Sequence, residues 1–315
     1  MEASAPQDYD LVITGGGPAG LTAGLYAARS KMRTLLIEKM TPGGQAANTN
    51  MIENYPGFPE GVLGPDLAQA METQAKHFGL LIQSGEVNKI SLRHPFWELE
   101  VETQTIQAKA VIVATGVNPQ KLGVPGEEEL RGRGVSYCAT CDGPFFHEQE
   151  IAVVGGGDSA VGEALYLTRF AKRVYIIHRR NALRAEKILQ ERSFINKKIE
   201  ILWETVVCSI IGETGVEGLE VQNVKSREKR ILKVNGVFFY IGLKPNTDFL
   251  KGTIELDESG YVLTDANMAT SAPGIFAAGD VRKKLLRQLT TAVGDGAIAA
   301  FAVERFLESW PKDVK

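Results

Sequence analysis

A stretch of 28 residues occurs twice in this chain of 315 residues, and the two copies align without a gap at a constant offset of 140 residues. Residues 11–38 have the sequence LVITGGGPAGLTAGLYAARSKMRTLLIE, and residues 151–178 have the sequence IAVVGGGDSAVGEALYLTRFAKRVYIIH. Eight positions are identical, including three consecutive glycines. A single glycine-rich match is weak evidence, whereas two matches in register predict two units built on the same motif.

Both copies have the pattern of strand, glycine turn, helix and strand. Each begins with a short apolar run, at residues 11–13 and 151–154, which is typical of a buried parallel strand. A helix-like stretch rich in alanine, leucine and tyrosine follows the glycines, and a second apolar run follows the helix, at residues 34–37 and 174–177. The pattern predicts an α/β protein with two Rossmann-like dinucleotide-binding domains.

The small residues of each turn have separate roles in binding a dinucleotide. The first glycine permits a tight turn, the second lets the backbone approach a pyrophosphate, and the third position lets helix and strand pack closely. The pyrophosphate is expected on the N–H groups at the start of the helix. A pair of glycine turns without a ligand is the alternative. The predicted contacts are Gly15, Gly17, Pro18, Ala19 and Gly20 in the first copy, and Gly155, Gly157, Asp158, Ser159 and Ala160 in the second.

The residue that ends the second strand distinguishes the two ligands. Glu38 ends the first copy and can accept a hydrogen bond from the 2′-hydroxyl of an adenosine ribose, which suits FAD. His178 ends the second copy and is followed by Arg179, Arg180 and Arg184, which suit the 2′-phosphate of NADPH. We expect these basic residues at a helix start, where they would oppose the helix dipole, so a bound anion explains them better than a solvated face.

Two of the three cysteines, Cys138 and Cys141, are separated by two residues and lie between the repeats. This spacing allows a disulfide if the pair opens a helix, and the helix dipole would then stabilise a thiolate. Structural zinc is the alternative, but it requires four ligands, and neither Cys208 nor His147 has a partner at a suitable spacing. We therefore predict a redox pair and no metal site, with Asp142 as the proton donor to a leaving thiolate.

The charge and hydropathy of the chain exclude other classes of function. Its 35 basic and 38 acidic residues give a net charge of −3, which argues against nucleic acid as the main partner. No run of 18 apolar residues occurs, so we expect no membrane span. The N-terminal segment lacks the pattern of a secretory signal, and we expect a cytoplasmic protein.

The motifs of this chain resemble those of the low-molecular-weight, bacterial and plant-type thioredoxin reductases in order and spacing. The resemblance extends over nearly the whole chain and is most specific at CATCDGPFF, residues 138–146. It also includes both glycine turns, HRRNALR at residues 178–184 and GIFAAGDVRKKLLRQLTTAVGDG at residues 274–296. The implied organisation is a discontinuous FAD-binding domain, residues 1–116 and 247–315, into which an NADPH-binding domain with the dithiol, residues 117–246, is inserted.

The resemblance also implies the remaining FAD contacts. These come from the segment after the second strand, the ENYPGFP motif, the end of the strand before Gly116, the end of the apolar strand at residues 274–278, and the glutamine-containing segment that opens the last helix. The residues are Lys39, Gly44, Gln45, Asn54, Thr115, Gly116, Gly279, Asp280, Arg287, Gln288 and Leu289.

The activity implied by the resemblance is the reduction of thioredoxin, or of a thioredoxin-like protein, by NADPH through FAD and the Cys138–Cys141 pair. The resemblance also implies a homodimer, the usual assembly of this family. One alternative is a dithiol oxidase or a ferredoxin-fed reductase of the same fold, although neither requires the intact NADPH motif. Another is a nucleotide-sensing binding protein, although binding alone requires neither the cysteine pair nor Asp142.

Overall fold

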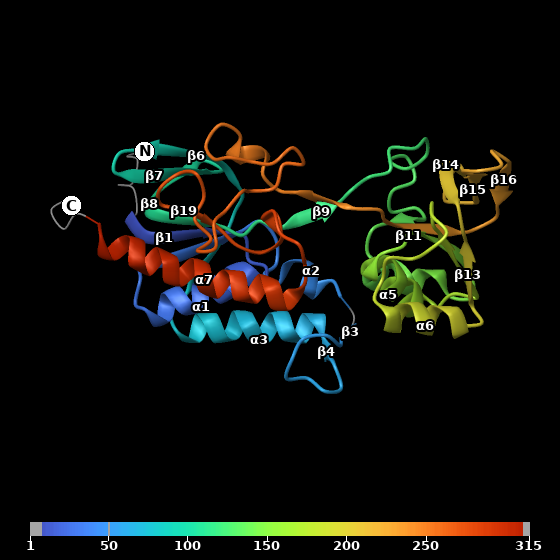
Figure 1. The fold of residues 1–315 in the computed structure, drawn as a ribbon, viewed down its shortest axis with the longest axis horizontal. Coiled ribbons are helices and arrows are strands. Elements are labelled where there is room, and N and C mark those ends of the chain that lie inside the picture. The colour runs from blue at the N-terminus through green and yellow to red at the C-terminus, as the bar shows by residue number, and fades with distance from the viewer. Residues whose placement is uncertain (1–7, 50, 311–315) are drawn as a thin grey trace. The chain divides into compact units, whose positions relative to one another are not determined.

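The computed structural model describes residues 8–49 and 51–310, and the chain divides into two units (Figure 1). The first unit joins residues 1–118 to residues 244–315, and the second comprises residues 119–243. Residues 1–7, 50 and 311–315 of the predicted FAD domain lie outside the described residues. Each unit is built on its own sheet with a core of parallel strands, as the α/β prediction requires.

The sheet of the first unit combines a parallel part with an antiparallel edge. Its strand order is β5-β2-β1-β8-β7-β6, and β19 also pairs with β8. The parallel strands are β1 (Asp8–Thr14), β2 (Thr34–Glu38), β5 (Leu81–Ser84), β8 (Gln104–Val113) and β19 (Ile275–Ala277). The antiparallel edge consists of β6 (Val87–Arg93) and β7 (Phe96–Val101).

Helices of the first unit pack closely because small residues line their contacts. The longer helices are α1 (Pro18–Arg29), α3 (Gly64–His77) and α7 (Leu289–Glu308). A Cβ on Gly296 of α7 would lie only 2.2 Å from the carbonyl oxygen of Ala19, so α1 and α7 meet backbone to backbone. Smaller elements are α2 (Gly44–Ala47), β3 (Met51–Ile52), β4 (Val62–Leu63), η2 (Asp248–Leu250) and η3 (Gly279–Val281).

The second unit has a fully parallel sheet of order β10-β17-β11-β12-β13. These strands are β10 (Val135–Ser136), β17 (Gly236–Tyr240), β11 (Glu150–Gly155), β12 (Arg173–Ile177) and β13 (Ile199–Leu202). An antiparallel sheet adds β14 (Thr205–Ile211), β15 (Gly218–Asn223) and β16 (Lys229–Leu232). The helices are α4 (Ala139–Asp142), η1 (Gly143–Phe146), α5 (Asp158–Leu167) and α6 (Lys187–Ile195).

The repeat forms the same motif in both units, as predicted. In the first unit β1, α1 and β2 follow one another, and in the second β11, α5 and β12 do so. The paired strands are parallel, with Val12 opposite Leu35 and Ala152 opposite Tyr175. Their side chains are buried because helices or further strands cover both faces of each sheet.

Two chain segments connect the units, and they pair with each other as β9 (Val117–Pro119) and β18 (Leu243–Pro245). The N–H of Gln120 donates to the carbonyl of Gly242 at 2.9 Å, and the N–H of Asn246 donates to the carbonyl of Gly116 at 3.1 Å.

Within residues 8–49 and 51–310, no helix combines the length and the apolar character that crossing a membrane requires.

Candidate active site

The first glycine turn has a tight interior and an open outer side. Gly15 adopts a φ of +100°, a conformation that favours glycine, and a Cβ on Gly20 would lie 1.9 Å from the carbonyl oxygen of Gly15. Gly17 is the N-cap of α1, and a Cβ there would meet no atom closer than 4.0 Å. The N–H groups that open α1, beginning with Ala19 after Pro18, therefore face a space that a phosphate can enter.

Other predicted FAD contacts surround this turn, although they are distant in sequence. A Cβ on Gly44 would lie 3.1 Å from the Cα of Gly17, and a Cβ on Gly279 would lie 2.8 Å from the Cβ of Ala19. A Cβ on Gly15 would lie 2.9 Å from the Cα of Thr115, which follows the end of β8. The fold thus brings segments from both parts of the first unit to the start of α1.

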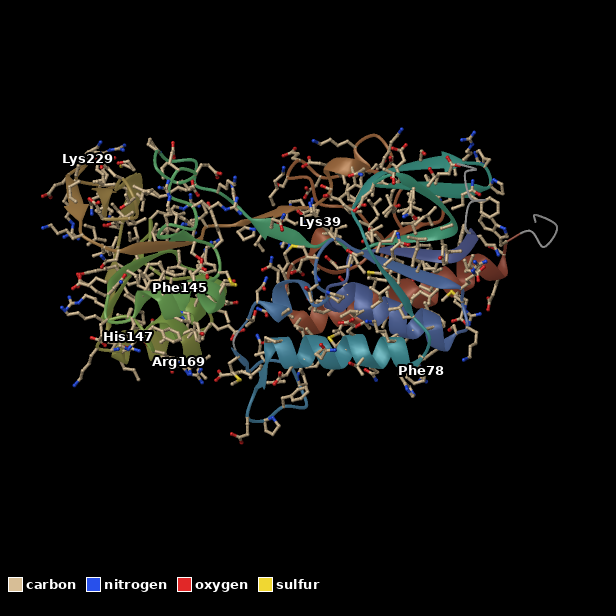
Figure 2. The ribbon with its side chains drawn as sticks, turned by 180° about the vertical axis from the view of Figure 1, so that it is seen from behind. Lys39, Phe78, Phe145, His147, Arg169 and Lys229 are labelled. Carbon is tan, nitrogen blue, oxygen red and sulfur yellow. A yellow bond between two sulfur atoms is a disulfide. The ribbon has the colours of Figure 1, made fainter. Side chains whose placement is uncertain are left out.

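Glu38 contacts the glycine turn directly. Its Oε2 accepts a hydrogen bond from the N–H of Gly16 at 2.5 Å, and its Oε1 accepts one from the N–H of Met40 at 2.9 Å. The carboxylate is therefore fixed beside the turn. Lys39, labelled in Figure 2, instead forms an ion pair of 2.7 Å with Glu86, and both side chains are largely exposed.

Polar side chains join the remaining predicted contacts of the first unit. The amide nitrogen of Asn54 donates to Oε1 of Gln288 at 3.2 Å, and that of Gln45 donates to the carbonyl of Val117 at 3.2 Å. Thr115 donates through its hydroxyl to the carbonyl of Asn246 at 2.8 Å. A Cβ on Gly116 would meet no atom within 4 Å, so the backbone there is also open to a ligand.

Asp280 presents a polar atom that nothing in the described chain satisfies. Its Oδ1 is buried and has no hydrogen-bond partner, although Lys284 lies 3.4 Å away. Burial raises the pKa of the Asp280 carboxyl, while the charges of Lys284 and Arg287 act in the opposite direction. Such an atom is suited to a hydroxyl-bearing ligand.

The segment after Asp280 leads into the start of α7. The Arg287 guanidinium lies over the ring of Tyr261, 4.0 Å from its centroid, and its Nε donates to the carbonyl of Asp280 at 3.4 Å. Gln288 is the N-cap of α7 in a capping box, and Leu289 is the first helical residue. This is the helix start predicted from the sequence.

The second glycine turn has the same plan with a different third position. Gly157 is the N-cap of α5, and a Cβ there would meet nothing within 4 Å. Ala160 occupies the third position and is buried. Asp158 opens the helix, followed by Ser159, and its Oδ1 accepts a hydrogen bond from the N–H of Glu186 at 2.8 Å.

The basic cluster lies in a loop, and its predicted position at a helix start is wrong. Helix α6 begins only at Lys187, because backbone hydrogen bonds hold the preceding loop against the glycine turn. The N–H of Arg184 donates to the carbonyl of Gly156 at 2.7 Å. The side chains of Arg179, Arg180 and Arg184 are exposed. The argument from the helix dipole therefore does not apply, but the backbone of Arg184 contacts the glycine turn.

His178 lies between this loop and the glycine turn. Its side chain is 5% exposed, and its Nε2 lies 3.0 Å from the carbonyl oxygen of Ala182. A Cβ on Gly156 would lie 2.4 Å from the imidazole, so the ring packs against the turn as Glu38 does in the first unit. Burial lowers the pKa of His178, backbone hydrogen bonds at Ala182 and Gly155 act in the opposite direction, and the charges of Arg184 and Arg180 lower it further.

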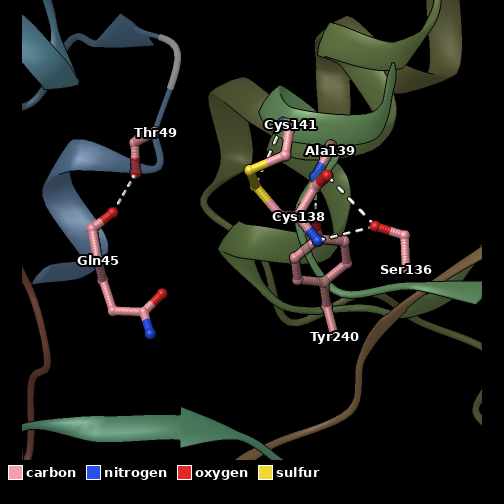
Figure 3. The surroundings of a disulfide bond; sticks show 7 residues. All are labelled: Gln45, Thr49, Ser136, Cys138, Ala139, Cys141 and Tyr240. Carbon is pink, nitrogen blue, oxygen red and sulfur yellow. Dashed lines mark hydrogen bonds between the residues drawn. A yellow bond between two sulfur atoms is a disulfide. The ribbon is translucent and has the colours of Figure 1, made fainter. Parts of the chain in front are cut away.

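The two cysteines form a disulfide at the start of a short helix (Figure 3). Cys138 and Cys141 are bonded, with their Cα atoms 5.4 Å apart. Cys138 is the N-cap of α4, and its Sγ accepts a hydrogen bond from the N–H of Cys141 at 3.2 Å. The Ser136 hydroxyl accepts a hydrogen bond from the N–H of Cys138 at 3.1 Å. Asp142 completes the first turn and is partly exposed.

The disulfide and the second glycine turn lie at the same edge of the sheet. Strands β10, β17 and β11 are parallel, and α4 and α5 follow the carboxyl ends of β10 and β11. Tyr240, at the carboxyl end of β17, lies between them: its hydroxyl accepts a hydrogen bond from the N–H of Ala139 at 3.0 Å, and its carbonyl abuts Gly155.

A partly buried carboxyl group of α5 also belongs to this neighbourhood. Burial raises the pKa of Glu163 to about 7. Burial also raises the pKa of the Tyr240 hydroxyl, and the negative charges of Glu163 and Asp142 raise it further.

The third cysteine, Cys208, is a free, half-buried thiol on β14. No group of three or more His, Cys, Asp or Glu residues within 8–49 and 51–310 is arranged to hold a metal ion.

Several residues of the site were not found from the sequence. Tyr240 ends a strand next to the repeat, and only the strand order β17-β11 indicates its place. Buried Glu127 accepts hydrogen bonds from the N–H of Leu122 at 3.0 Å and the hydroxyl of Tyr137 at 2.6 Å, and so anchors the residue before Cys138. Lys284, four positions after Asp280, could have been suggested by that spacing alone.

Comparisons with known proteins agree with this geometry. The family model described as pyridine nucleotide-disulphide oxidoreductase matches residues 9–296. A thioredoxin reductase of Listeria monocytogenes is 47% identical over 307 residues, covering 97% of this chain and 96% of the relative. A thioredoxin reductase of Bacillus subtilis is 47% identical over 308 residues, covering 98% and 97%. The crystal structure of Lactococcus lactis thioredoxin reductase superposes with a TM-score of 0.94 at 48% identity and covers 96% of this chain and 100% of that one.

Proposed function

Because the chain belongs to the pyridine nucleotide-disulphide oxidoreductases and, within them, to the thioredoxin reductases, we propose how its residues carry out that reaction. The activity is the NADPH-dependent reduction of thioredoxin, with FAD and NADPH as cofactors. The observation that carries the proposal is the Cys138–Cys141 disulfide at the start of α4, on the sheet edge that also carries the second glycine turn.

The first unit is the FAD-binding domain in this proposal. Its residues fit the cofactor, because the turn at Gly17 is open, the buried Oδ1 of Asp280 lacks a partner, and Glu38 lies beside the turn. The pyrophosphate would contact the N–H groups that open α1, and Asp280 would accept a hydrogen bond from a cofactor hydroxyl. When bound, FAD relays two electrons from NADPH to the disulfide. The start of α7, after Arg287 and Gln288, would stabilise negative charge there.

The second unit is the NADPH-binding domain in this proposal. Gly157 leaves the start of α5 open for the pyrophosphate, and Arg179, Arg180 and Arg184 provide exposed cations for the 2′-phosphate. The buried ring of His178 packs against Gly156 and would hold the loop against the turn.

Dithiol exchange would complete the reaction on the two cysteines. A thiolate of the reduced pair attacks one sulfur of the thioredoxin disulfide, forms a mixed disulfide and releases one thioredoxin thiolate. The second cysteine then displaces the other thioredoxin sulfur, which restores the Cys138–Cys141 bond and transfers two electrons in total. Asp142, in the first turn of α4, would hold and supply the proton that a released thiolate takes up. The N-cap position of Cys138 favours its thiolate form.

We also propose a homodimer and a cytoplasmic location. Exposed apolar side chains on α1 and α7 support a dimer, namely Tyr26, Ile298 and Phe301, which are 49%, 43% and 54% exposed. Phe145, labelled in Figure 2, follows the cysteine pair, is 75% exposed and offers an apolar contact to thioredoxin. A dithiol that must be reduced again in each cycle suits a reducing compartment.

Anaerobic titration of the FAD-containing protein with NADPH tests the proposal. NADPH should bleach the visible flavin absorbance, and NADH should do so much less readily. The variants Cys138→Ser and Cys141→Ser should keep this bleaching and lose thioredoxin turnover, while Cys208→Ser should keep both. A flavin that stays oxidised with NADPH would favour the oxidase or the ferredoxin-fed alternative instead.

A further inference from the structure

Lys284 lies at the centre of a network of charges in the first unit, and its side chain is only 10% exposed. Its ammonium group lies 3.0 Å from Oδ2 of Asp295, 3.2 Å from the hydroxyl oxygen of Thr291 and 3.4 Å from Oδ1 of Asp280. The ammonium group donates hydrogen bonds to Thr291 and Asp295, and Asp280 lies beside it at ion-pair distance with its Oδ1 still without a hydrogen-bond partner.

Two of these neighbours are tied to the backbone of the predicted FAD site. Oδ2 of Asp295 also accepts a hydrogen bond from the N–H of Gly279 at 3.0 Å, and its Oδ1 pairs with Arg282 at 2.9 Å. The hydroxyl of Thr291 accepts a hydrogen bond from the N–H of Gln288 at 3.2 Å and belongs to the capping box of α7. Lys284 therefore connects η3, which carries Asp280, with the start of α7.

Asp280 depends on this network because its other surroundings disfavour a carboxylate. Burial and the charge of Asp295 raise the pKa of Asp280, and Lys284 is the largest influence that lowers it. Arg282 pairs with Asp295, and Arg287 contacts the carbonyl of Asp280. Without Lys284, the Asp280 carboxylate would lose its nearest cation.

We propose that Lys284 is a positioning residue of the FAD site, whose ammonium group joins Asp280, Asp295 and Thr291 and so directs the Asp280 carboxylate at a cofactor hydroxyl. The inference rests on the proposed function, because Asp280 is assigned to FAD there. Lys284 itself need not contact the cofactor.

Neighbouring Lys283 provides a matched control. Its side chain is 63% exposed, and its nearest acidic partner, Asp257, lies 3.9 Å away. We would compare Lys284→Met and Lys283→Met as full-length FAD-containing proteins. The rate of FAD release on dilution is followed by the recovery of flavin fluorescence, and the midpoint potential of the bound flavin is measured by dye equilibration.

The expected result is that Lys284→Met releases FAD at least about tenfold faster than the unsubstituted protein and shifts the flavin potential, because a hydrogen bond to a charged group is lost. Lys283→Met should behave like the unsubstituted protein, and Lys284→Arg should restore most of the retention. If Lys284→Met does not fold, Lys284→Gln carries the same comparison.

Equal release rates and potentials in the Lys284 and Lys283 variants would overturn the inference while leaving the proposed function intact. If the unsubstituted protein retains no FAD, the proposed function fails, and this inference fails with it.

Discussion

The hydroxyl of Tyr240 accepts a hydrogen bond from the N–H of Ala139 at 3.0 Å, one residue after the N-cap cysteine of α4. This N–H has no partner within the helix, because the first N–H groups of any helix lack one. A strand end thus holds the redox helix in place on the sheet edge (Figure 3).

Removing this hydroxyl should affect the dithiol more than the flavin. In Tyr240→Phe the N–H of Ala139 loses its partner at a cost of about 1 kcal/mol, and we expect thioredoxin turnover to fall about fivefold while NADPH still reduces FAD. The control is Tyr175→Phe. The Tyr175 hydroxyl donates to Glu150 at 2.9 Å, and Glu150 begins β11, so this bond lies at the opposite end of the sheet from α4. Steady-state assays with thioredoxin measure the effect; equal rates in both variants would contradict the role given to Tyr240.

Neutralising the basic loop should reduce the preference for NADPH. In the double variant Arg179→Gln and Arg180→Gln, we expect the KM for NADPH to rise at least about tenfold and the KM for NADH to change little, since only NADPH has the 2′-phosphate. Arg173→Gln is the control, because Arg173 begins β12, the strand that precedes the loop, and pairs with Glu200 at 2.9 Å. Unchanged selectivity in the double variant would refute the 2′-phosphate assignment.

Glu163 should make stability depend on pH. Burial raises its pKa from 4.5 to about 7 in the folded protein, so the folded state holds this proton more tightly than the unfolded state. The stabilisation from that proton is complete below the unfolded pKa and disappears as pH rises through about 7. Its loss amounts to at most about 3 kcal/mol.

Urea unfolding of the FAD-containing protein between pH 5 and pH 8 measures this effect. Glu163→Gln cannot ionise, so its stability relative to the unsubstituted protein should increase as pH rises. Glu191→Gln, on the exposed side of α6, should show no such trend. A stability difference for Glu163→Gln that is equal at both ends of the range would contradict the prediction.

The third position of the first turn should not tolerate alanine, although the second turn has one. In Gly20→Ala the new Cβ would lie 1.9 Å from the carbonyl oxygen of Gly15, and overpacking of this kind costs about 1–3 kcal/mol or more. We expect a lower melting temperature and poor FAD retention. Gly162→Ala in α5, where a Cβ meets nothing within 4 Å, should instead stabilise the protein by about 0.5–1 kcal/mol. A Gly20→Ala protein as stable as the original would show that α1 can shift away from β1.

The sequence by itself determined the local motifs of this protein and the chemistry that they can support. The repeat predicted both strand, turn, helix and strand units, and the spacing of Cys138 and Cys141 predicted the disulfide that the structure contains. Such features could be predicted because their hydrogen bonds and close contacts are made within about 30 residues, so residue type and spacing alone specify them.

Only the tertiary structure decided which distant residues meet. The pairing of β17 with β11 places Tyr240 at the redox helix, and the packing of α7 on α1 brings Gly296 against the backbone of Ala19. It also placed the basic cluster in a loop, because backbone bonds to Gly156 hold residues 184 and 185 there and delay the start of α6 until Lys187. These contacts depend on strand order and helix packing, which join segments as far apart in the sequence as Ala19 and Gly296 and leave no periodic signal in it.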